Sequence, residues 1–308
     1  MKKIFLLILA LLLIAVPVQA QNNSTTKNTD KVAGTASEVA EKFYASLPQA
    51  KGEYKSRVRP ILLEGAMNIE TEILVRALKN PVTYRELHYL FVAGTYKDYP
   101  VVVVRTEQGM ANAAASTALA IKKFNPIAVI NQGTAGGHDP KLDIGDIVVG
   151  TETFDAFSLR TDYSPLGAGA DFTRHKMRGT YAYDEATGKF QKYETFSSDP
   201  TLFNIAFSVA NKHKDFNVVS GILSTSDVWL ENLDYIKFLH ETYGSSCEEM
   251  ETASAAQICH TAGIPFIGIR VISNNVTINR EYDPKSADVA QDFVLLVVES
   301  YIRDVLKK

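Results

Sequence analysis

Short apolar runs alternate with stretches of helical spacing across residues 59–305. Almost wholly apolar runs occur at 59–64, 127–131, 144–150, 218–223 and 265–272. Such runs are typical of strands that are buried on both faces. The spacing predicts helices over 70–78, 110–123, 201–213, 233–243, 252–262 and 287–305, with a short strand at 247–250. This alternation of strands and helices predicts an α/β domain around a largely buried sheet.

Turn residues refine this prediction. Residues 90–94 and 101–105 flank Tyr96-Lys97-Asp98, which indicates a hairpin. We expect the strand at 127–131 to end in the glycine-rich loop 133–137, and residues 155–198 to be polar and rich in loops.

The N-terminus has the pattern of a secretory signal. Met1-Lys2-Lys3 precedes an apolar run over 4–16 and the small-residue exit Pro17–Ala20. The alternative is a membrane anchor, but the run is shorter than the roughly 20 residues that a spanning helix needs. We therefore expect a signal peptide at 1–20, a disordered linker at 21–37 and a catalytic domain at 38–308, exported to the periplasm or secreted.

Charge and cysteine content narrow the possible partners. The chain has 32 basic and 35 acidic residues, and two of the basic ones lie in the signal, so the mature chain has a net charge of −5. Nucleic acid and anionic membranes instead need a basic face. We expect neither partner once the signal is cleaved. Cys247 and Cys259 could form a disulfide in an oxidising compartment, but their contexts favour buried free thiols. No Cys/His cluster has zinc spacing, and we expect no metal or organic cofactor.

Polar residues follow two of the predicted strands at points where α/β sheets bind ligands. In GAMNIE (65–70), Glu70 could polarise a water, or could simply complement the dipole of the helix that follows. The glycines at 133–137 could let the backbone approach a ligand, or could form an ordinary turn.

Two later strand ends carry further candidates. Glu249-Met250-Glu251 could hold two ribose hydroxyls through a carboxylate, or could be a surface acidic pair. Ser273-Asn274 could pair with N7 and the 6-amino group of adenine, or could form an Asx turn.

Together and in this order, these strings resemble one family. GAMNIE (65–70), INQGTAGG (130–137), LDIGDIVV (142–149), STSDVW (224–229), EEMET (248–252) and IPFIGIRVISN (264–274) resemble the purine nucleoside phosphorylase/uridine phosphorylase superfamily. Within it, 5′-methylthioadenosine/S-adenosylhomocysteine nucleosidases are the most similar. The resemblance covers about residues 59–305 and implies a three-layer sandwich with a central mixed, mostly buried β-sheet flanked by helices. It also implies a homodimer.

The resemblance implies roles for particular residues. Glu70 and Asn274 occupy catalytic positions, with Glu70 activating the attacking water. Trp229 stacks on the purine, Leu230 offers a backbone contact to the base, and Glu251 holds the ribose hydroxyls. The full expected substrate-binding set is Ala66, Met67, Thr134, Ala135, Gly136, Trp229, Leu230, Glu249, Met250, Glu251 and Ser273.

Asn274 departs from the pattern, because these nucleosidases have an aspartate there that protonates N7. An amide can donate only a hydrogen bond. Asn is compatible with adenine and also with a futalosine-hydrolase-like preference for 6-oxopurines, so the base stays open. Gln132 is a minor departure from the more common Thr.

The positions of arginines bear on whether water or phosphate accepts the ribosyl group. Related phosphorylases carry phosphate-binding arginines that residues 65–70 and 128–132 lack, and Arg105 is interpreted as the end of a strand. Water is therefore favoured. A phosphate-dependent phosphorylase and a non-catalytic nucleoside-binding protein are the alternatives to the expected nucleosidase.

Overall fold

The computed structural model describes Lys42 and residues 58–184 and 187–306. The predicted signal peptide (1–20) and linker (21–37) lie outside the described residues, as does the predicted start of the catalytic domain at residue 38. None of the described helices is long and apolar enough to span a bilayer.

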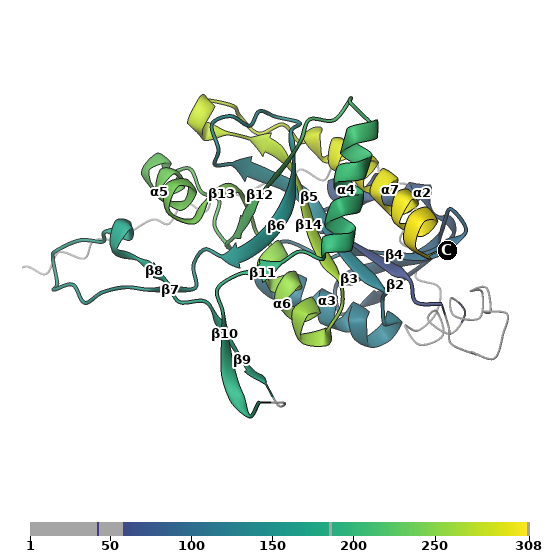
Figure 1. Cartoon of the computed structure of the whole chain (residues 1–308), viewed down its shortest axis with the longest axis horizontal. Coiled ribbons are helices and arrows are strands. Elements are labelled where there is room, and N and C mark those ends of the chain that lie inside the picture. The colour runs from purple at the N-terminus through teal and green to yellow at the C-terminus, as the bar shows by residue number, and fades with distance from the viewer. Residues whose placement is uncertain (1–41, 43–57, 185–186, 307–308) are drawn as a thin grey trace, which may run out of the picture. The chain divides into compact units, whose positions relative to one another are not determined.

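A mixed ten-stranded sheet forms the centre of the fold (Figure 1). Its strands are β1 (Ile61–Gly65), β2 (Lys79–Glu86), β3 (Tyr89–Tyr96), β4 (Tyr99–Arg105), β5 (Ala128–Gly137), β6 (Ile147–Asp155), β11 (Phe196–Ser197), β12 (Val218–Thr225), β13 (Ser245–Glu249) and β14 (Phe266–Asn274). The order is β11-β6-β12-β13-β5-β1-β4-β3-β2.

One half of this sheet closes on itself. β14 pairs in parallel with β5 and antiparallel with β6, β6 and β13 both pair in parallel with β12, and β13 returns antiparallel to β5. The other half, β1 to β4, stays open and extends from β5 through β1. The closure brings the C-terminal ends of β5, β13 and β14 together.

Helices cover both faces of the sheet. They are α2 (Asn68–Ala77), α3 (Met110–Phe124), α4 (Pro200–Lys212), α5 (Leu233–Tyr243), α6 (Thr252–Ala262) and α7 (Ser286–Tyr301), and a π-helical turn over Ile302–Leu306 ends the described chain. Figure 1 shows α2, α4 and α7 on one side and α3 and α6 on the other. The predicted three-layer α/β fold is confirmed.

Apolar side chains from the strands explain the two layers. In β1, Ile61 and Leu63 belong to the core beneath α7, whereas Leu62 belongs to the core beneath α3 and α6. All three are at most 1% exposed. A strand with successive side chains buried on opposite faces needs cover on both sides, which the two helix layers supply.

Two sequence expectations were wrong in detail. Residues 133–137 do not leave the sheet as a loop, because β5 continues through them to Gly137 and pairs there with β13 and β14. The strand expected from Ile144 begins only at Ile147, after a turn in which Gly145 has φ 91°. The strand β2 was not predicted at all.

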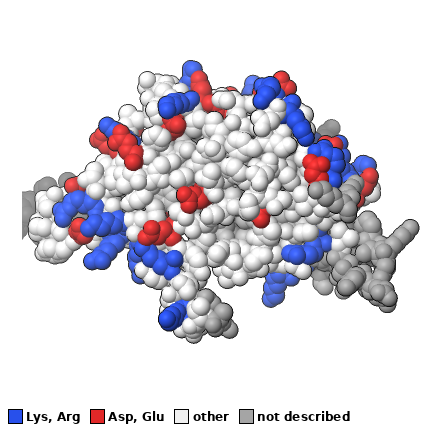
Figure 2. Space-filling view, viewed as in Figure 1, with Lys and Arg blue, Asp and Glu red and all other residues white. Residues whose placement is uncertain are grey.

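Other expectations are confirmed. β3 and β4 form the predicted hairpin around residues 96–98, with left-handed backbone at Lys97 and Asp98. Cys247 and Cys259 are buried and free. The segment 155–198 contains two small antiparallel pairs, which are β7 (Leu159–Arg160) with β8 (Lys176–Met177) and β9 (Thr180–Asp184) with β10 (Lys189–Tyr193). On the face in Figure 2, most charged side chains of both signs lie toward the rim.

Candidate active site

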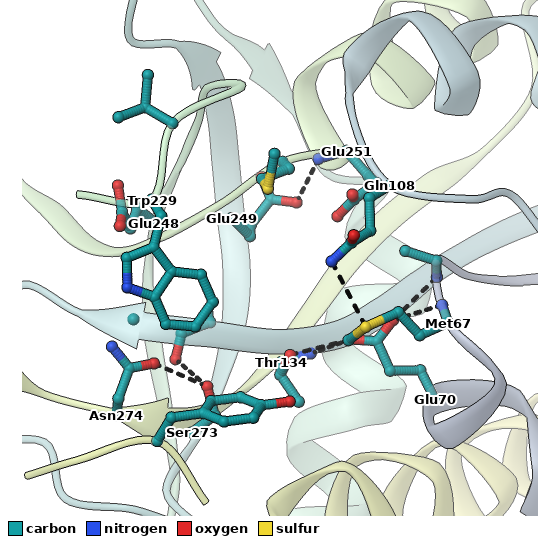
Figure 3. A pocket seen from close by; sticks show the side chains of 16 residues that line it. Met67, Glu70, Gln108, Thr134, Trp229, Glu248, Glu249, Glu251, Ser273 and Asn274 are labelled. Carbon is teal, nitrogen blue, oxygen red and sulfur yellow. Dashed lines mark hydrogen bonds between the residues drawn. The ribbon is translucent and has the colours of Figure 1, made fainter. Parts of the chain in front are cut away.

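A cavity of about 290 Å³ lies where β1, β5, β13 and β14 end (Figure 3). Ligands of α/β sheets bind in this kind of position, and small-molecule pockets start at about this volume. Its lining residues are Ala66, Met67, Glu70, Gln108, Thr134, Ala135, Gly136, Val228, Trp229, Glu248, Glu249, Met250, Glu251, Ser273, Asn274 and Tyr282. Every residue of the expected site is therefore in the cavity wall except Leu230.

Glu70 lies in the first turn of α2 and is 3% exposed. One carboxylate oxygen accepts the backbone N–H groups of Ala66 (2.9 Å) and Met67 (3.0 Å). The other accepts the backbone N–H and the hydroxyl of Thr134, at 2.8 and 3.0 Å. Glu70 thus caps its helix and also faces the cavity. Its surroundings therefore fit both sequence interpretations, a group that complements the helix dipole and a group that polarises a water.

Gly133, the first glycine of INQGTAGG, leaves the space that the Glu70 carboxylate occupies. A Cβ on Gly133 would lie 2.8 Å from Oε1 of Glu70, which is closer than such atoms approach. Gln132, the neighbouring departure from the family pattern, donates from Nε2 to the backbone oxygen of Glu70 at 2.6 Å. β5 therefore holds Glu70 through both its backbone and its side chains.

Glu251 lies across the cavity at the N-terminus of α6 and is 8% exposed. Its Oε1 accepts the backbone N–H of Gly109 at 2.9 Å, and its Oε2 lies 3.9 Å from Nη2 of Arg270. Burial, and next the negative charge of Glu249, raise the pKa of Glu251, against the opposing effect of Arg270. Its carboxyl faces the same cavity as Glu70, as Figure 3 shows.

Glu249 has a different environment, although it is part of the cavity wall. Its Oε2 lies 2.5 Å from Nη2 of Arg270, and both side chains are 1% exposed. The same oxygen accepts the backbone N–H groups of Glu251 (2.9 Å) and Thr252 (2.8 Å), and Oε1 accepts the hydroxyl of Thr225. These internal partners occupy the carboxylate, which leaves Glu251 as the member of the acidic pair suited to bind a ligand.

Aromatic and amide groups line the other end of the cavity. Trp229 is 58% exposed and packs edge-on against Tyr282, with ring centroids 5.7 Å apart. The hydroxyl of Ser273 donates to Oδ1 of Asn274 at 2.9 Å. Because that contact occupies the amide oxygen, the NH₂ group of Asn274 is left to donate to a ligand.

Leu230 does not line the cavity. Its backbone N–H donates to Oε1 of Glu248 at 2.9 Å, and its side chain packs with Phe154 and Tyr235 in a small core beside α5. The N–H expected to meet the base thus contacts a carboxyl group of the cavity wall.

Sequence reasoning missed four lining residues: Gln108, Val228, Glu248 and Tyr282. Glu248 had a usable signal, because it is an acidic residue inside a strand of five residues next to two predicted site residues. Gln108, Val228 and Tyr282 lie outside the helices and strands, and no pattern in the chain indicates that the three segments meet.

The wall of this cavity, within the described part of the chain, contains no Lys or Arg. Arg105 ends β4 as predicted, and its guanidinium contacts Glu107 (2.9 Å) and Asn68. Across residues 58–184 and 187–306, no three His, Cys, Asp or Glu side chains are grouped to hold a metal ion.

Comparisons with known proteins identify the family of this chain. Residues 60–303 match the model of the phosphorylase superfamily. The chain is 31% identical to the 5′-methylthioadenosine/S-adenosylhomocysteine nucleosidase of Anoxybacillus flavithermus, over 70% of this chain and 84% of the relative. It is 30% identical to the nucleosidase of the same name from a Geobacillus species, over 78% of this chain and 98% of the relative.

A solved structure shows the same likeness. The nucleosidase of Neisseria meningitidis, in complex with methylthio-immucillin-A, superposes with a TM-score of 0.64 at 25% identity, over 79% of this chain and 99% of that one. The chain therefore belongs to the phosphorylase superfamily and, within it, to the 5′-methylthioadenosine/S-adenosylhomocysteine nucleosidases, a family of N-ribosyl hydrolases.

Proposed function

We propose that this enzyme hydrolyses the N-ribosidic bond of 5′-substituted purine nucleosides, such as 5′-methylthioadenosine or S-adenosylhomocysteine, and releases the free base. One observation carries the proposal. Glu70 and Glu251, which are 181 positions apart by their numbering, face one cavity together with the exposed indole of Trp229. A sugar between two carboxylates and a base on an aromatic ring is the geometry that this cleavage requires.

Glu70 is the group that activates water. Cleavage gives the sugar oxocarbenium character, and a carboxylate that takes a proton from water makes it a competent nucleophile. Thr134, Ala66 and Met67 fix the orientation of this carboxylate before the substrate binds. A base held in place loses little free energy to reorganisation when the substrate reacts.

Glu251 binds the two ribose hydroxyls through its two carboxyl oxygens. Burial and Glu249 raise its pKa to about 8, and the positive charge that develops on the sugar favours its ionisation. Arg270 and the N–H of Gly109 stabilise the ionised form. A negative carboxylate beside the ribose also stabilises the positive charge that develops on the sugar.

Asn274 donates from its NH₂ group to N7 of the leaving purine, in the orientation that Ser273 sets. A hydrogen bond to N7 stabilises the negative charge that the base acquires. Trp229 stacks on the base and supplies affinity.

Water is the acceptor in this proposal. A phosphate dianion needs cationic or backbone donors, and no cationic side chain is part of the described cavity wall. Arg105, the nearest candidate from the sequence, is paired with Glu107.

We also propose export and dimerisation. The pattern of residues 1–20 supports cleavage after Ala20, which N-terminal sequencing of the protein secreted by the native host would test. The likeness to the nucleosidase family supports a homodimer, which sedimentation of the purified protein would test.

The decisive test is base release without phosphate. Purified protein is incubated with 5′-methylthioadenosine, S-adenosylhomocysteine, adenosine and inosine in phosphate-free buffer, and products are separated by chromatography. We expect free base and free 5-substituted ribose. Release that depends strictly on phosphate and forms a ribose 1-phosphate would establish a phosphorylase instead, and binding without turnover would establish a binding protein.

A further inference from the structure

The proposed mechanism does not use Glu248, a carboxyl in the wall of the same cavity. Its side chain is 11% exposed and lies beside Trp229 and Asn274 in Figure 3, whereas Met67, Glu70 and Gln108 lie at the opposite side. A carboxyl at the end of the cavity that holds the aromatic ring and the amide is placed to meet the base.

One oxygen of this carboxyl has a partner and the other does not. Oε1 accepts the N–H of Leu230 at 2.9 Å. Oε2 is buried without a hydrogen bond, and Nε2 of His138, which is also buried without a partner, lies 3.9 Å from it. A buried polar atom without a partner is rare in proteins, so this carboxyl keeps hydrogen-bonding capacity that the protein itself does not use.

The surroundings of Glu248 favour its neutral form. The titratable groups that interact with it are His138, 3.9 Å away, and its neighbours in β13, Cys247 and Glu249. Burial lowers the pKa of His138 to about 3, so its imidazole is uncharged at neutral pH. Burial, and then Glu249, raise the pKa of Glu248 to about 8, against the opposing hydrogen bond from Leu230. At neutral pH the carboxyl is mostly an acid with one O–H donor and acceptor capacity on both oxygens.

The polar groups of Glu248 and Asn274 lie close together, beside Gly136 of β5. A Cβ on Gly136 would lie 3.3 Å from Nδ2 of Asn274 and 3.5 Å from Oε1 of Glu248, so both polar groups flank the same point of β5. In adenine, N7, the 6-amino group and N1 also follow one another along one edge. With Asn274 at N7, the next group along the wall meets the 6-amino group and N1.

We propose that Glu248 is a specificity-determining residue that, as a neutral carboxylic acid, donates a hydrogen bond to N1 of adenine and accepts one from the 6-amino group. This inference rests on the proposed cleavage of adenine nucleosides. A neutral carboxylic acid matches the acceptor at N1 and the donor at the 6-amino group. An ionised carboxylate would instead match the N1–H donor of a 6-oxopurine.

The test uses two variants of Glu248 and two substrates. Glu248→Gln keeps a donor and an acceptor but cannot ionise, and Glu248→Val removes both. The substrates are 5′-methylthioadenosine and 5′-methylthioinosine, measured between pH 6 and pH 9.5. Glu241→Gln, an exposed change on α5, is the matched control. Each variant is first checked for an unchanged melting temperature within a few degrees.

With 5′-methylthioadenosine, we expect kcat/KM of the wild type relative to Glu248→Gln to be constant below about pH 8 and to fall above it, because the wild-type carboxyl then ionises. Comparing two proteins on the same substrate cancels every other titration. Glu248→Val should raise KM for this substrate about 10- to 100-fold at pH 7, the loss expected for two hydrogen bonds, with a smaller change in kcat.

Two outcomes would overturn this role. One is unchanged KM and an unchanged pH profile in both variants, while the wild type still cleaves nucleosides. The other is a wild type that prefers 5′-methylthioinosine at pH 7. Glu248 would then be an ionised carboxylate that accepts the N1–H of a 6-oxopurine. If the wild type cleaves neither substrate, the proposed function fails, and calorimetry of adenine with wild type and Glu248→Val tests the contact by itself. Equal affinities would then refute it.

Discussion

Thr134 donates both its backbone N–H and its hydroxyl to one carboxylate oxygen of Glu70. This pair joins the first turn of α2 to the C-terminal half of β5, and it fixes the proposed base within the cavity. Glu70→Gln would present an amide NH₂ or a neutral oxygen to these donors and would remove the proton acceptor.

We therefore expect Glu70→Gln to lower kcat by about 10²- to 10⁴-fold, the usual contribution of a general base. Glu72→Gln, an exposed change on the same helix, should leave kcat unchanged. Steady-state kinetics with 5′-methylthioadenosine measure the effect, and thermal melting shows whether the altered cap has unfolded the protein. Full activity in a folded Glu70→Gln enzyme contradicts the proposed role.

Glu249→Gln should lower the free energy of unfolding. The change leaves the guanidinium of Arg270 buried without its closest counter-charge, a loss of about 3–5 kcal/mol when one partner of a buried ion pair is removed. Urea denaturation at pH 7 followed by circular dichroism measures this. Arg270 also donates to Oδ1 of Asn131 at 2.6 Å and lies 3.9 Å from Glu251. A decrease of less than 1 kcal/mol would show that these two partners suffice to hold it.

Trp229→Ala should weaken substrate binding and leave stability nearly unchanged, because the indole is 58% exposed. Base stacking on an aromatic side chain contributes about 1–3 kcal/mol, so KM should rise about 5- to 150-fold. Trp229→Phe keeps an aromatic face and should recover most of the affinity. Stacking is excluded as the source of affinity if Trp229→Ala binds as tightly as the wild type.

Asn274→Asp should raise kcat for 5′-methylthioadenosine. An aspartic acid can transfer a proton to N7, whereas an amide donates only a hydrogen bond, and general acid catalysis contributes about 10²-fold or more. The hydroxyl of Ser273 can donate to either side chain. Single-turnover measurements separate the chemical step from product release. A slower variant would mean that another group already protonates the base.

Glu64 gives a test of stability against pH. Burial raises its pKa to about 7 from the usual 4.5, against hydrogen bonds from Asn131 and Thr117. The folded protein therefore binds a proton that the unfolded chain releases at lower pH. The contribution of this carboxyl is fully present below about pH 4.5 and is lost as pH rises toward 7.

Accordingly, the unfolding free energy of the wild type relative to Glu64→Gln should decrease between pH 4.5 and pH 7 and be level above it. Urea denaturation at half-unit pH intervals measures the difference. A difference that does not vary with pH would show that Glu64 is ionised throughout this range.

The sequence predicted the fold well where a pattern repeats locally. Wholly apolar strands such as β1 and the helices that cover them follow from periodicity. Periodicity missed β2, since Lys79–Glu86 is mostly polar and gains its place by pairing with β3. It also ended β5 too early, because the glycines at 133–137 are typical of a turn and only pairing with β13 and β14 keeps them in the sheet.

Local patterns also predicted the positions of the site residues better than their long-range contacts. The expected residues other than Leu230 meet in one cavity because each lies near or just after the C-terminal end of a strand at the same edge of the sheet. The contacts of Glu249 and Glu248 could not be predicted, since they depend on Arg270 and Leu230, which reach them from other segments.

Alternation along β13 sends the two neighbouring glutamates to opposite sides of the strand, Glu248 toward His138 and Glu249 toward Arg270. Deleting Gly244, which precedes the strand, would shift β13 by one position, so that Glu249 would take the place of Glu248 and Met250 that of Glu249. The buried guanidinium of Arg270 would then face the thioether of Met250 in place of the Glu249 carboxylate. Spacing in this strand is therefore expected to tolerate length changes far less than the segment 155–198 does.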